Sequence, residues 1–205
     1  MEYVKIAPHQ YDCSTCPSPC DSKSKGKYIF EDDLSLSEYY EERIAQYVNS
    51  KGVYVANKSH EAGFPDVEVR EKSGEVKAYI EVKAQQRTFM QVEKILPYSR
   101  LLPSETLALN LSDLKRYFEQ YDHHQKPIYI VWVLLQRPCI LGANQYKLYT
   151  QKIEVLREIY EKQLNNRIFR RKSGIGDVVG GEHLGVVVNY HFSINELEEW
   201  NVVLG

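Results

Sequence analysis

Charged residues interrupt two runs of sequence that otherwise favour β-strands. The stretch is FPDVEVREKSGEVKAYIEVKA, residues 64–84, and it contains Asp66, Glu81 and Lys83. Strands prefer β-branched and aromatic residues, and aspartate is among the residues that they tolerate least. Residues that break a local preference in this way are often found at functional sites. We therefore take these three side chains as the first candidates for chemistry.

The spacing of the three residues predicts that they converge. Residues 66–70 and 76–84 each favour a strand, and a short turn between them favours a hairpin. Because side chains alternate between the faces of a strand, Glu81 and Lys83 share one face. Antiparallel pairing would then bring Asp66, at the start of the first strand, close to Glu81. The alternative is a surface hairpin with Asp66 in a turn and an ion pair between Glu81 and Lys83.

Two carboxylates and an ammonium group at one rim of a sheet could bind a metal ion. Carboxylates held together repel each other, and burial raises their pKa, unless a cation lies between them. Hard oxygen ligands suit Mg²⁺ or Mn²⁺, which keep waters and share their ligands with substrate phosphates. Such an ion stabilises charge on a phosphoryl group under attack, and a neighbouring lysine can hold the attacking water.

The elements that would position this site can be read along the chain. A helix is expected to begin near Ser35 or Ser37 and to end at Gly52, and residues 85–110 are expected to contain a short helix and a loop. The apolar run IYIVWVLL is typical of a strand covered on both faces. The main elements from residue 36 are a helix, strands at 53–57, 66–70 and 76–84, a helix at 111–124 capped by Ser112, and a strand at 128–135. This αβββαβ order predicts an α/β (α+β) fold with a mixed central sheet flanked by helices.

Pro65-Asp66 followed by Glu81-Val82-Lys83 in a strand–turn–strand setting resembles the PD-(D/E)xK nuclease superfamily. The resemblance covers roughly residues 36–135 and implies a restriction endonuclease-like core. It implies that Asp66, Glu81 and the backbone carbonyl of Val82 bind Mg²⁺ or Mn²⁺ and that Lys83 orients the attacking water.

The same resemblance implies two further site residues. Many members of the superfamily add an acid from the first helix, and Glu41 borders the apolar stripe of that helix. Gln85 matches the polar residue that often follows the motif. The alternative for Glu41 is a place on an ordinary charged helix face.

Three of the four cysteines form a C-x2-C-x3-C cluster, at Cys13, Cys16 and Cys20. A structural zinc site needs four ligands, and the fourth would be His9 or Cys139. With Cys139 as the fourth ligand, the four cysteines would also suit an iron–sulfur cluster. The resemblance to nucleases that contain such a cluster supports this second alternative. Free thiols in a reducing cytoplasm are the third alternative.

A basic segment rich in glycine is a candidate DNA-binding loop. It contains Arg167, Arg170, Arg171 and Lys172, and Arg87 is a further candidate after the motif. Such a loop can follow a phosphate backbone. Contacts to phosphates position a duplex but do not read its sequence. The alternative is a solvated basic turn.

The bulk composition limits the class of protein. The chain has 205 residues, 43% hydrophobic and 26% charged, which is ordinary for a globular protein. Its net charge of −2 provides no overall basic field, so affinity for DNA must come from a local patch. No segment approaches the roughly 18 apolar residues of a membrane span, and the N-terminus lacks the features of a secretion signal. We expect a cytoplasmic protein with no membrane partner.

We divide the chain into an irregular Cys-rich segment (1–30), the nuclease core (31–136) and an extension of the same domain (137–205). The extension is expected to contain an edge strand, a helix, the basic loop, a strand and a capped terminal helix in residues 193–200.

The leading hypothesis is a Mg²⁺-dependent DNA endonuclease of restriction type, whose extension serves recognition or dimerisation, and a homodimer would cut both strands. The alternatives are a repair, recombination or defence nuclease that selects DNA structure, and a non-catalytic nucleic-acid-binding module.

Overall fold

The computed structural model describes residues 30–205 except 60, 62, 87, 143, 172–177, 180–181, 184–186, 203 and 205. No described helix combines the length and apolar character needed to cross a membrane. The elements are, in order, α1 (Phe30–Ser50), β1 (Val55–Lys58), β2 (Val67–Arg70), β3 (Val76–Gln85), α2 (Val92–Ile95), β4 (Thr106–Asn110), α3 (Leu111–His124), β5 (Ile128–Leu135), α4 (Pro138–Leu141), β6 (Tyr146–Lys152), α5 (Ile153–Gln163), η3 (Leu164–Arg167), β7 (Ile168–Arg170), β8 (Val178–Val179), β9 (Glu182–His183), β10 (Val188–Ser193), η5 (Ile194–Glu196) and β11 (Glu198–Glu199).

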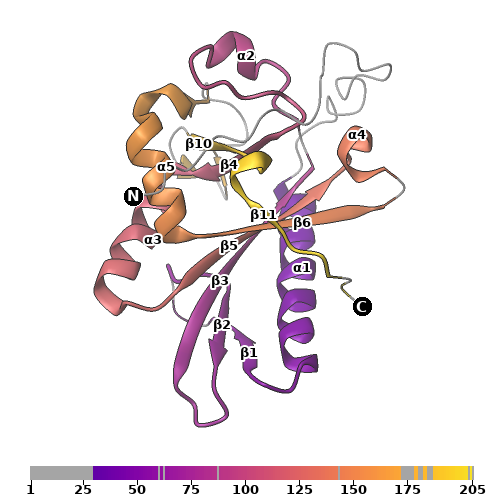
Figure 1. Ribbon diagram of the computed structural model, residues 1–205, viewed down its shortest axis with the longest axis vertical. Helices are drawn as coiled ribbons and strands as arrows, with labels where there is room; N and C mark the ends of the chain where they lie inside the picture. Colours follow the sequence, from indigo (N-terminus) through magenta and orange to yellow (C-terminus); the bar gives the residue numbers. More distant parts are fainter. Residues whose placement is uncertain are drawn as a thin grey trace.

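The central sheet has the strand order β1-β2-β3-β5-β6-β11. The pairing of β3 with β5 is parallel and the other pairings are antiparallel, so the sheet is mixed. Helix α1 lies on one side of this sheet, and α3 and α5 lie on the other (Figure 1). The predicted fold class, a mixed sheet flanked by helices with an αβββαβ core, is confirmed.

Strand β5 is shared by two hydrophobic cores, as its continuous apolar sequence predicted. Ile130 and Trp132 face the core on the side of α3 and α5. Val131 and Val133 face the core on the side of α1. Because all four side chains are at most 2% exposed, the strand is covered on both faces and holds the two layers of the molecule together.

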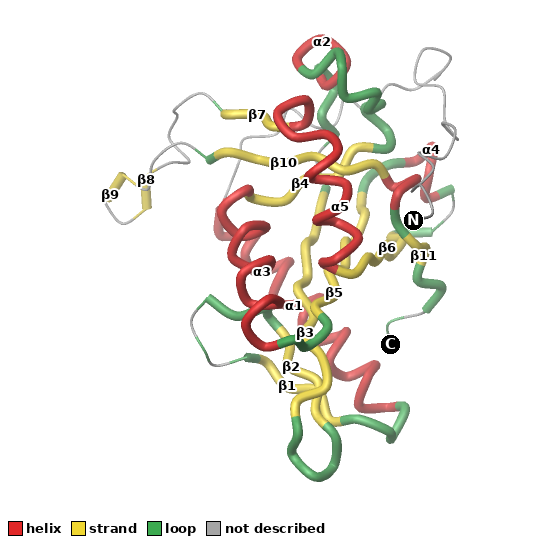
Figure 2. Tube along the Cα trace, turned by 60° about the vertical axis from the view of Figure 1, so that its left-hand side comes forward, coloured by secondary structure: helices red, strands yellow, loops and turns green. Residues whose placement is uncertain are grey.

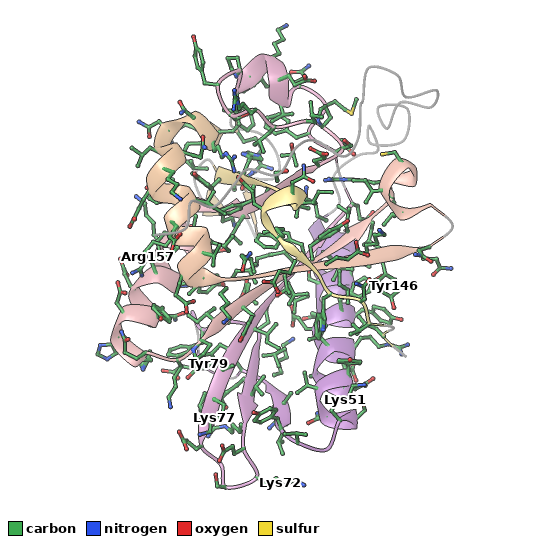
Figure 3. The ribbon with its side chains drawn as sticks, in the orientation of Figure 1. Lys51, Lys72, Lys77, Tyr79, Tyr146 and Arg157 are labelled. Carbon is green, nitrogen blue, oxygen red and sulfur yellow. The ribbon has the colours of Figure 1, made fainter. Side chains whose placement is uncertain are left out.

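The two faces of the sheet can be followed at two labelled tyrosines. Tyr79, on β3, packs into the core that contains Trp132, away from α1 (Figure 3). Tyr146, on β6, lies on the α1 side, where its ring centroid is 5.9 Å from that of Tyr40 (Figure 3). The alternation predicted for the third strand is therefore present, and the face of Tyr79 is the face of Glu81 and Lys83.

A second sheet, of order β4-β10-β7, was not expected from the sequence. Residues 85–110 contain the expected short helix, α2, but also the strand β4, which pairs with β10 through partners such as Ala108 and His191. Figure 2 shows this sheet between α2 and α3. Its strands are far apart in the sequence, so no local hairpin signal could reveal their pairing.

Several predicted boundaries were wrong. Helix α1 begins at Phe30, before Ser35, and the N-cap of α3 is Asn110 instead of Ser112. The predicted terminal helix at 193–200 is the short 3₁₀ helix η5 followed by β11. Because β11 pairs with β6, the strand predicted at the edge of the sheet has a partner on each side.

Candidate active site

The three predicted residues lie together at the junction of β2 and β3. Asp66 directly precedes β2, whose first residue is the register partner of Ile80, so Asp66 lies opposite Glu81. The backbone N–H of Val82 donates a hydrogen bond of 2.8 Å to Asp66 Oδ2. This bond fixes the Asp66 carboxylate against β3, the strand that carries Glu81 and Lys83.

Glu81 is a buried acid whose two oxygens have different surroundings. Its side chain is 2% exposed, and Lys83 Nζ forms an ion pair with Oε1. The other oxygen, Oε2, is buried and makes no hydrogen bond of normal geometry among the described residues, although the Tyr117 phenol and Asp66 lie close to the Glu81 carboxyl group. A buried polar atom without a partner is costly, so this oxygen indicates a site that a ligand would complete.

The pKa values of the two carboxyl groups are raised. For Asp66 burial is the main cause and the charge of Glu41 adds to it, while the Lys83 charge and the Val82 N–H act in the opposite direction. For Glu81 burial again dominates, opposed by Lys83 and reinforced by the charge of Asp66. The charge of Asp66 therefore makes ionisation of Glu81 less favourable, which is the situation that a bound cation relieves.

Lys83 remains charged at neutral pH although it is largely enclosed. Burial by itself would lower its pKa, but the charges of Glu81 and Asp66 outweigh burial and raise it. Its side chain is 33% exposed. The site therefore presents a fixed ammonium group that can reach solvent beside two carboxylates.

Helix α3 contributes residues that the sequence did not single out. The Tyr117 side chain is buried against Glu81, and burial together with the charge of Glu81 raises the pKa of its phenol. Asp113 pairs with Arg116 at 2.9 Å, and its charge also raises the pKa of Lys83. The sequence predicted a helix at 111–124, but it could not show that Tyr117 and Asp113 meet the acids of the site.

Glu41 lies near the predicted site, on α1. Its side chain is 10% exposed and forms an ion pair with Lys58, whose Nζ lies 3.3 Å from Glu41 Oε2. Its charge contributes to the raised pKa of Asp66. Glu41 is therefore electrically coupled to the site, and its participation in catalysis stays a prediction.

Gln85 connects the motif strand to the second sheet. Its Nε2 donates to the carbonyl of Thr106 at 3.2 Å, and its Oε1 accepts from the N–H of Ala108 at 2.9 Å. Both ends of the amide thus hold β4 in place beside β3. This is a positioning role, and a direct role for Gln85 in catalysis stays a prediction.

The donor atoms at the acid pair fit a magnesium-like ion. Within the described residues, no group of three or more His, Cys, Asp or Glu side chains is arranged to hold a metal ion. Two carboxylates are nevertheless the usual protein share of a Mg²⁺ site, whose other ligands are waters and substrate phosphates. The unpartnered Oε2 of Glu81 beside Asp66 meets this requirement. Participation of the Val82 carbonyl stays a prediction.

Arg167 does not have the exposed position expected of a DNA contact. Its side chain is buried, and its guanidinium donates two hydrogen bonds, of 2.6 and 2.8 Å, to the carboxylate of Glu196. A guanidinium already bound to a buried carboxylate is not available to a phosphate. Arg170 is exposed and Arg171 is half-buried, so they remain candidates, whereas Lys172 and Arg87 lie outside the described residues.

The predicted zinc or iron–sulfur ligands are almost entirely outside the described part of the chain. His9, Cys13, Cys16 and Cys20 all precede it. Cys139 is an exposed thiol on α4. Both metal alternatives at the cysteines stay predictions.

No protein-family model matches the chain. No curated protein is similar to it in sequence. Among solved structures, the fold is similar to Hjc from Archaeoglobus fulgidus, a Holliday junction resolvase from an archaeal hyperthermophile, with 10% sequence identity and a TM-score of 0.39. The similarity covers 78% of this chain and 89% of Hjc.

Proposed function

We propose that this protein is a nuclease that hydrolyses phosphodiester bonds in DNA with the help of Mg²⁺ or Mn²⁺. The observation that carries the proposal is the buried, unpartnered Oε2 of Glu81, next to Asp66 and to the charged Lys83. An ordinary surface ion pair would leave both carboxylate oxygens in water. This arrangement instead concentrates negative charge where a hard cation and a phosphate would complete the site.

In the proposed reaction each residue has a separate task. Asp66 and Glu81 would hold the ion, which supplies a water of lowered pKa and offsets charge on the phosphoryl group. Lys83 stays protonated, so its ammonium can orient that water and stabilise charge that develops on the phosphate oxygens. The water would lose a proton to solvent as its oxygen bonds to phosphorus and the bond to the sugar oxygen breaks, and the sugar oxygen would take up a proton from solvent. One DNA end then carries a phosphate and the other a hydroxyl.

Of the two substrate hypotheses, we favour a nuclease that selects DNA structure over one of restriction type. Direct readout of a sequence in the major groove uses a helix or a two-stranded β-ribbon that enters the groove. Within the described residues of 137–205, β8 and β9 form a separate two-stranded ribbon, whereas α5 packs into the core and β6, β7, β10 and β11 pair with other strands of the two sheets. These parts of the extension therefore build the body of the protein. A homodimer stays a prediction.

The test is cleavage of labelled DNA in Mg²⁺, with flapped, branched and fully paired substrates and a plain plasmid. We expect Asp66→Asn and Lys83→Met each to lower the rate about 100-fold or more, because each removes a group that acts in the transition state. Glu119→Gln and Lys115→Met are matched controls on the exposed face of α3, and they should cut at the wild-type rate. Circular dichroism checks that every variant is folded.

Three results would separate the hypotheses. Discrete plasmid bands would favour the restriction-type reading. DNA binding without metal-dependent cutting in the wild type would indicate the non-catalytic module. Wild-type rates for Asp66→Asn or Lys83→Met would show that the assignment of the site is wrong.

A further inference from the structure

A cavity of about 490 Å³ adjoins the proposed active site. It lies between residues 83–86, 88 and 89, at the end of β3 and just after it, and the second sheet of β4, β10 and β7. Lys83 lines this cavity and also pairs with Glu81. A group bound in the cavity would therefore lie next to a ligand bound at the two carboxylates.

One face of the second sheet lines the cavity, and on that face Phe169 packs against the small core of Val92, Leu96 and Leu101. On β10, Tyr190 and Phe192 face the core beside Trp132, while Asn189 and His191 point to the opposite face and line the cavity. The neighbouring strand adds Ala108, whose small side chain leaves space. A face with two polar side chains and a small one is what a ligand site needs and a core does not.

Aromatic rings form one wall of the cavity. The ring centroid of Phe89 lies 5.1 Å from that of Phe169 and 4.9 Å from that of His191. All three side chains line the cavity. Such a wall offers flat surfaces on which another planar group can stack, and nucleobases stack on aromatic side chains in this way without regard to sequence.

Amides supply hydrogen-bonding groups on another side of the cavity. Asn110 and Asn189 are register partners across β4 and β10, and both line the cavity. Asn110 occupies the N-cap position of α3, where asparagine usually caps the helix, yet its side chain makes no capping hydrogen bond. An amide presents a donor and an acceptor together, which matches the edge of a base.

Two further groups make the cavity suitable for an uncharged polar ligand. His191 Nδ1 lies 3.2 Å from the carbonyl oxygen of Arg167, which can only accept, so Nδ1 donates and Nε2 is left as an acceptor. Burial lowers the pKa of His191 to about 4, so the ring is neutral at physiological pH. Thr88 Oγ1 is buried without a hydrogen-bond partner among the described residues. Of the described residues that line the cavity, Lys83 is the only one that carries a charge at neutral pH, so the cavity is not built for a second phosphate.

We infer that this cavity accepts an unpaired nucleobase of the DNA, next to the phosphodiester held at Asp66, Glu81 and Lys83. The substrate class would then be DNA with an unpaired nucleotide at or beside the cleaved bond, because a base within a duplex is stacked and paired and cannot enter. This inference rests on the proposed nuclease function and specifies its substrate.

The experiment compares three duplexes of the same sequence context. One carries a single unpaired 2-aminopurine, one has an abasic residue at that position, and one is fully paired. Binding to the full-length protein is measured in Ca²⁺, with gels run on the same samples to check that the DNA is intact. We expect the unpaired base to bind at least about fivefold more tightly than the abasic site, with quenching of its fluorescence as it stacks.

Two variants test whether the unpaired base binds in the cavity. Phe89→Leu keeps apolar volume but removes the stacking surface, and Asn189→Ala removes an amide. Each should abolish most of the preference for the unpaired base over the abasic site. Tyr98→Ala is the control, because Tyr98 is an aromatic residue that is 80% exposed and does not line the cavity. Thermal melting shows whether each variant is folded, and Asn189→Ala tests the cavity independently of the packing around Phe89.

Equal affinity for the unpaired base and the abasic site would overturn the inference, as would an unchanged preference in folded Phe89→Leu and Asn189→Ala. Cleavage assays in Mg²⁺ separate this failure from that of the proposed function. Cutting of fully paired and unpaired DNA at the same rate would support the proposed nuclease function and contradict the assignment of the cavity to a nucleobase. A preference for the unpaired base in Ca²⁺ without cutting of any substrate in Mg²⁺ would support the assignment of the cavity and contradict the proposed nuclease function.

Discussion

Glu81 carries a carboxylate at a position where burial disfavours its ionised form. Lys83 compensates part of this charge through Oε1, but Oε2 has no partner among the described residues and Asp66 adds a second negative charge nearby. The metal-free site is therefore held together against repulsion between its own groups. Such destabilisation is common where a protein keeps groups in place for a ligand.

A pH-dependent comparison of Asp66→Asn with the wild type tests this repulsion. The folded-state pKa values of Asp66 and Glu81 are raised. Such groups favour folding while protonated, and this contribution is lost as the pH rises above about 4 and through the raised pKa values. Without metal, Asp66→Asn should therefore gain in free energy of unfolding relative to the wild type between pH 4 and pH 7. Denaturant unfolding in EDTA measures the difference.

Added Mg²⁺ should reverse this order at pH 7, since an ion that binds the folded wild type stabilises it by mass action and binds the variant poorly. Glu119→Gln is the matched control and should follow the wild type at every pH. A difference between Asp66→Asn and the wild type that stays constant from pH 4 to pH 7 would contradict the account of the acid pair.

At the scale of elements, a buried ion pair joins η3 to η5. Arg167, at the end of η3, donates two hydrogen bonds to Glu196, and Glu196 also accepts from the N–H of Ser193 at 3.0 Å. Ser193 and Glu196 form a capping box at η5. Since β10 ends at Ser193, the pair fixes the end of the strand that contributes Asn189 and His191 to the cavity.

Removing the charge of Glu196 should therefore destabilise the protein strongly. We expect Glu196→Gln to lower the free energy of unfolding by about 3 kcal/mol, because it leaves a buried guanidinium without a counter-charge. Glu199→Gln is the control, since its ion pair with Lys147 is partly exposed and should be worth about 1 kcal/mol or less. Chemical denaturation gives both values. Equal effects of the two changes would show that burial does not strengthen the Arg167–Glu196 pair.

At the scale of the whole molecule, β5 couples two cores that lie on opposite faces of one sheet. Trp132 belongs to the core under α3 and α5, and Trp200 packs against the core under α1. Strands β6, β7, β10 and β11 of residues 137–205 enter the same sheets as the strands of the predicted nuclease core, whereas β8 and β9 pair with each other. We therefore expect the described parts of 31–136 and 137–205 to unfold together, in keeping with the predicted division into segments of one domain.

Substitutions on the two faces of β5 test this cooperativity. Ile130→Ala should cost about 2–5 kcal/mol, and Val131→Ala should cost less because fewer atoms are removed. Each variant should still unfold in one transition, with the same midpoint by tryptophan fluorescence and by far-UV circular dichroism. Two separate transitions in either variant would indicate that the two cores are independent folding units.

The sequence by itself determined the features that depend on near neighbours. The two-residue alternation along 76–84 placed Glu81 and Lys83 on one face, and the adjoining hairpin brought Asp66 to them, because pleating and a short turn leave little freedom. The unbroken apolar run at 128–135 likewise predicted a strand buried on both faces.

Only the tertiary structure decided the features that depend on distant partners. It paired Ala108 with His191, turned Tyr117 towards Glu81, and buried Arg167 against Glu196. Basic residues beside glycines look the same in the sequence whether they lie in solvent or meet a buried acid. The cavity next to Lys83 is likewise formed by segments more than 80 residues apart. Local pattern specifies which face of a strand is polar, whereas the identity of the group that meets that face depends on how the whole chain packs.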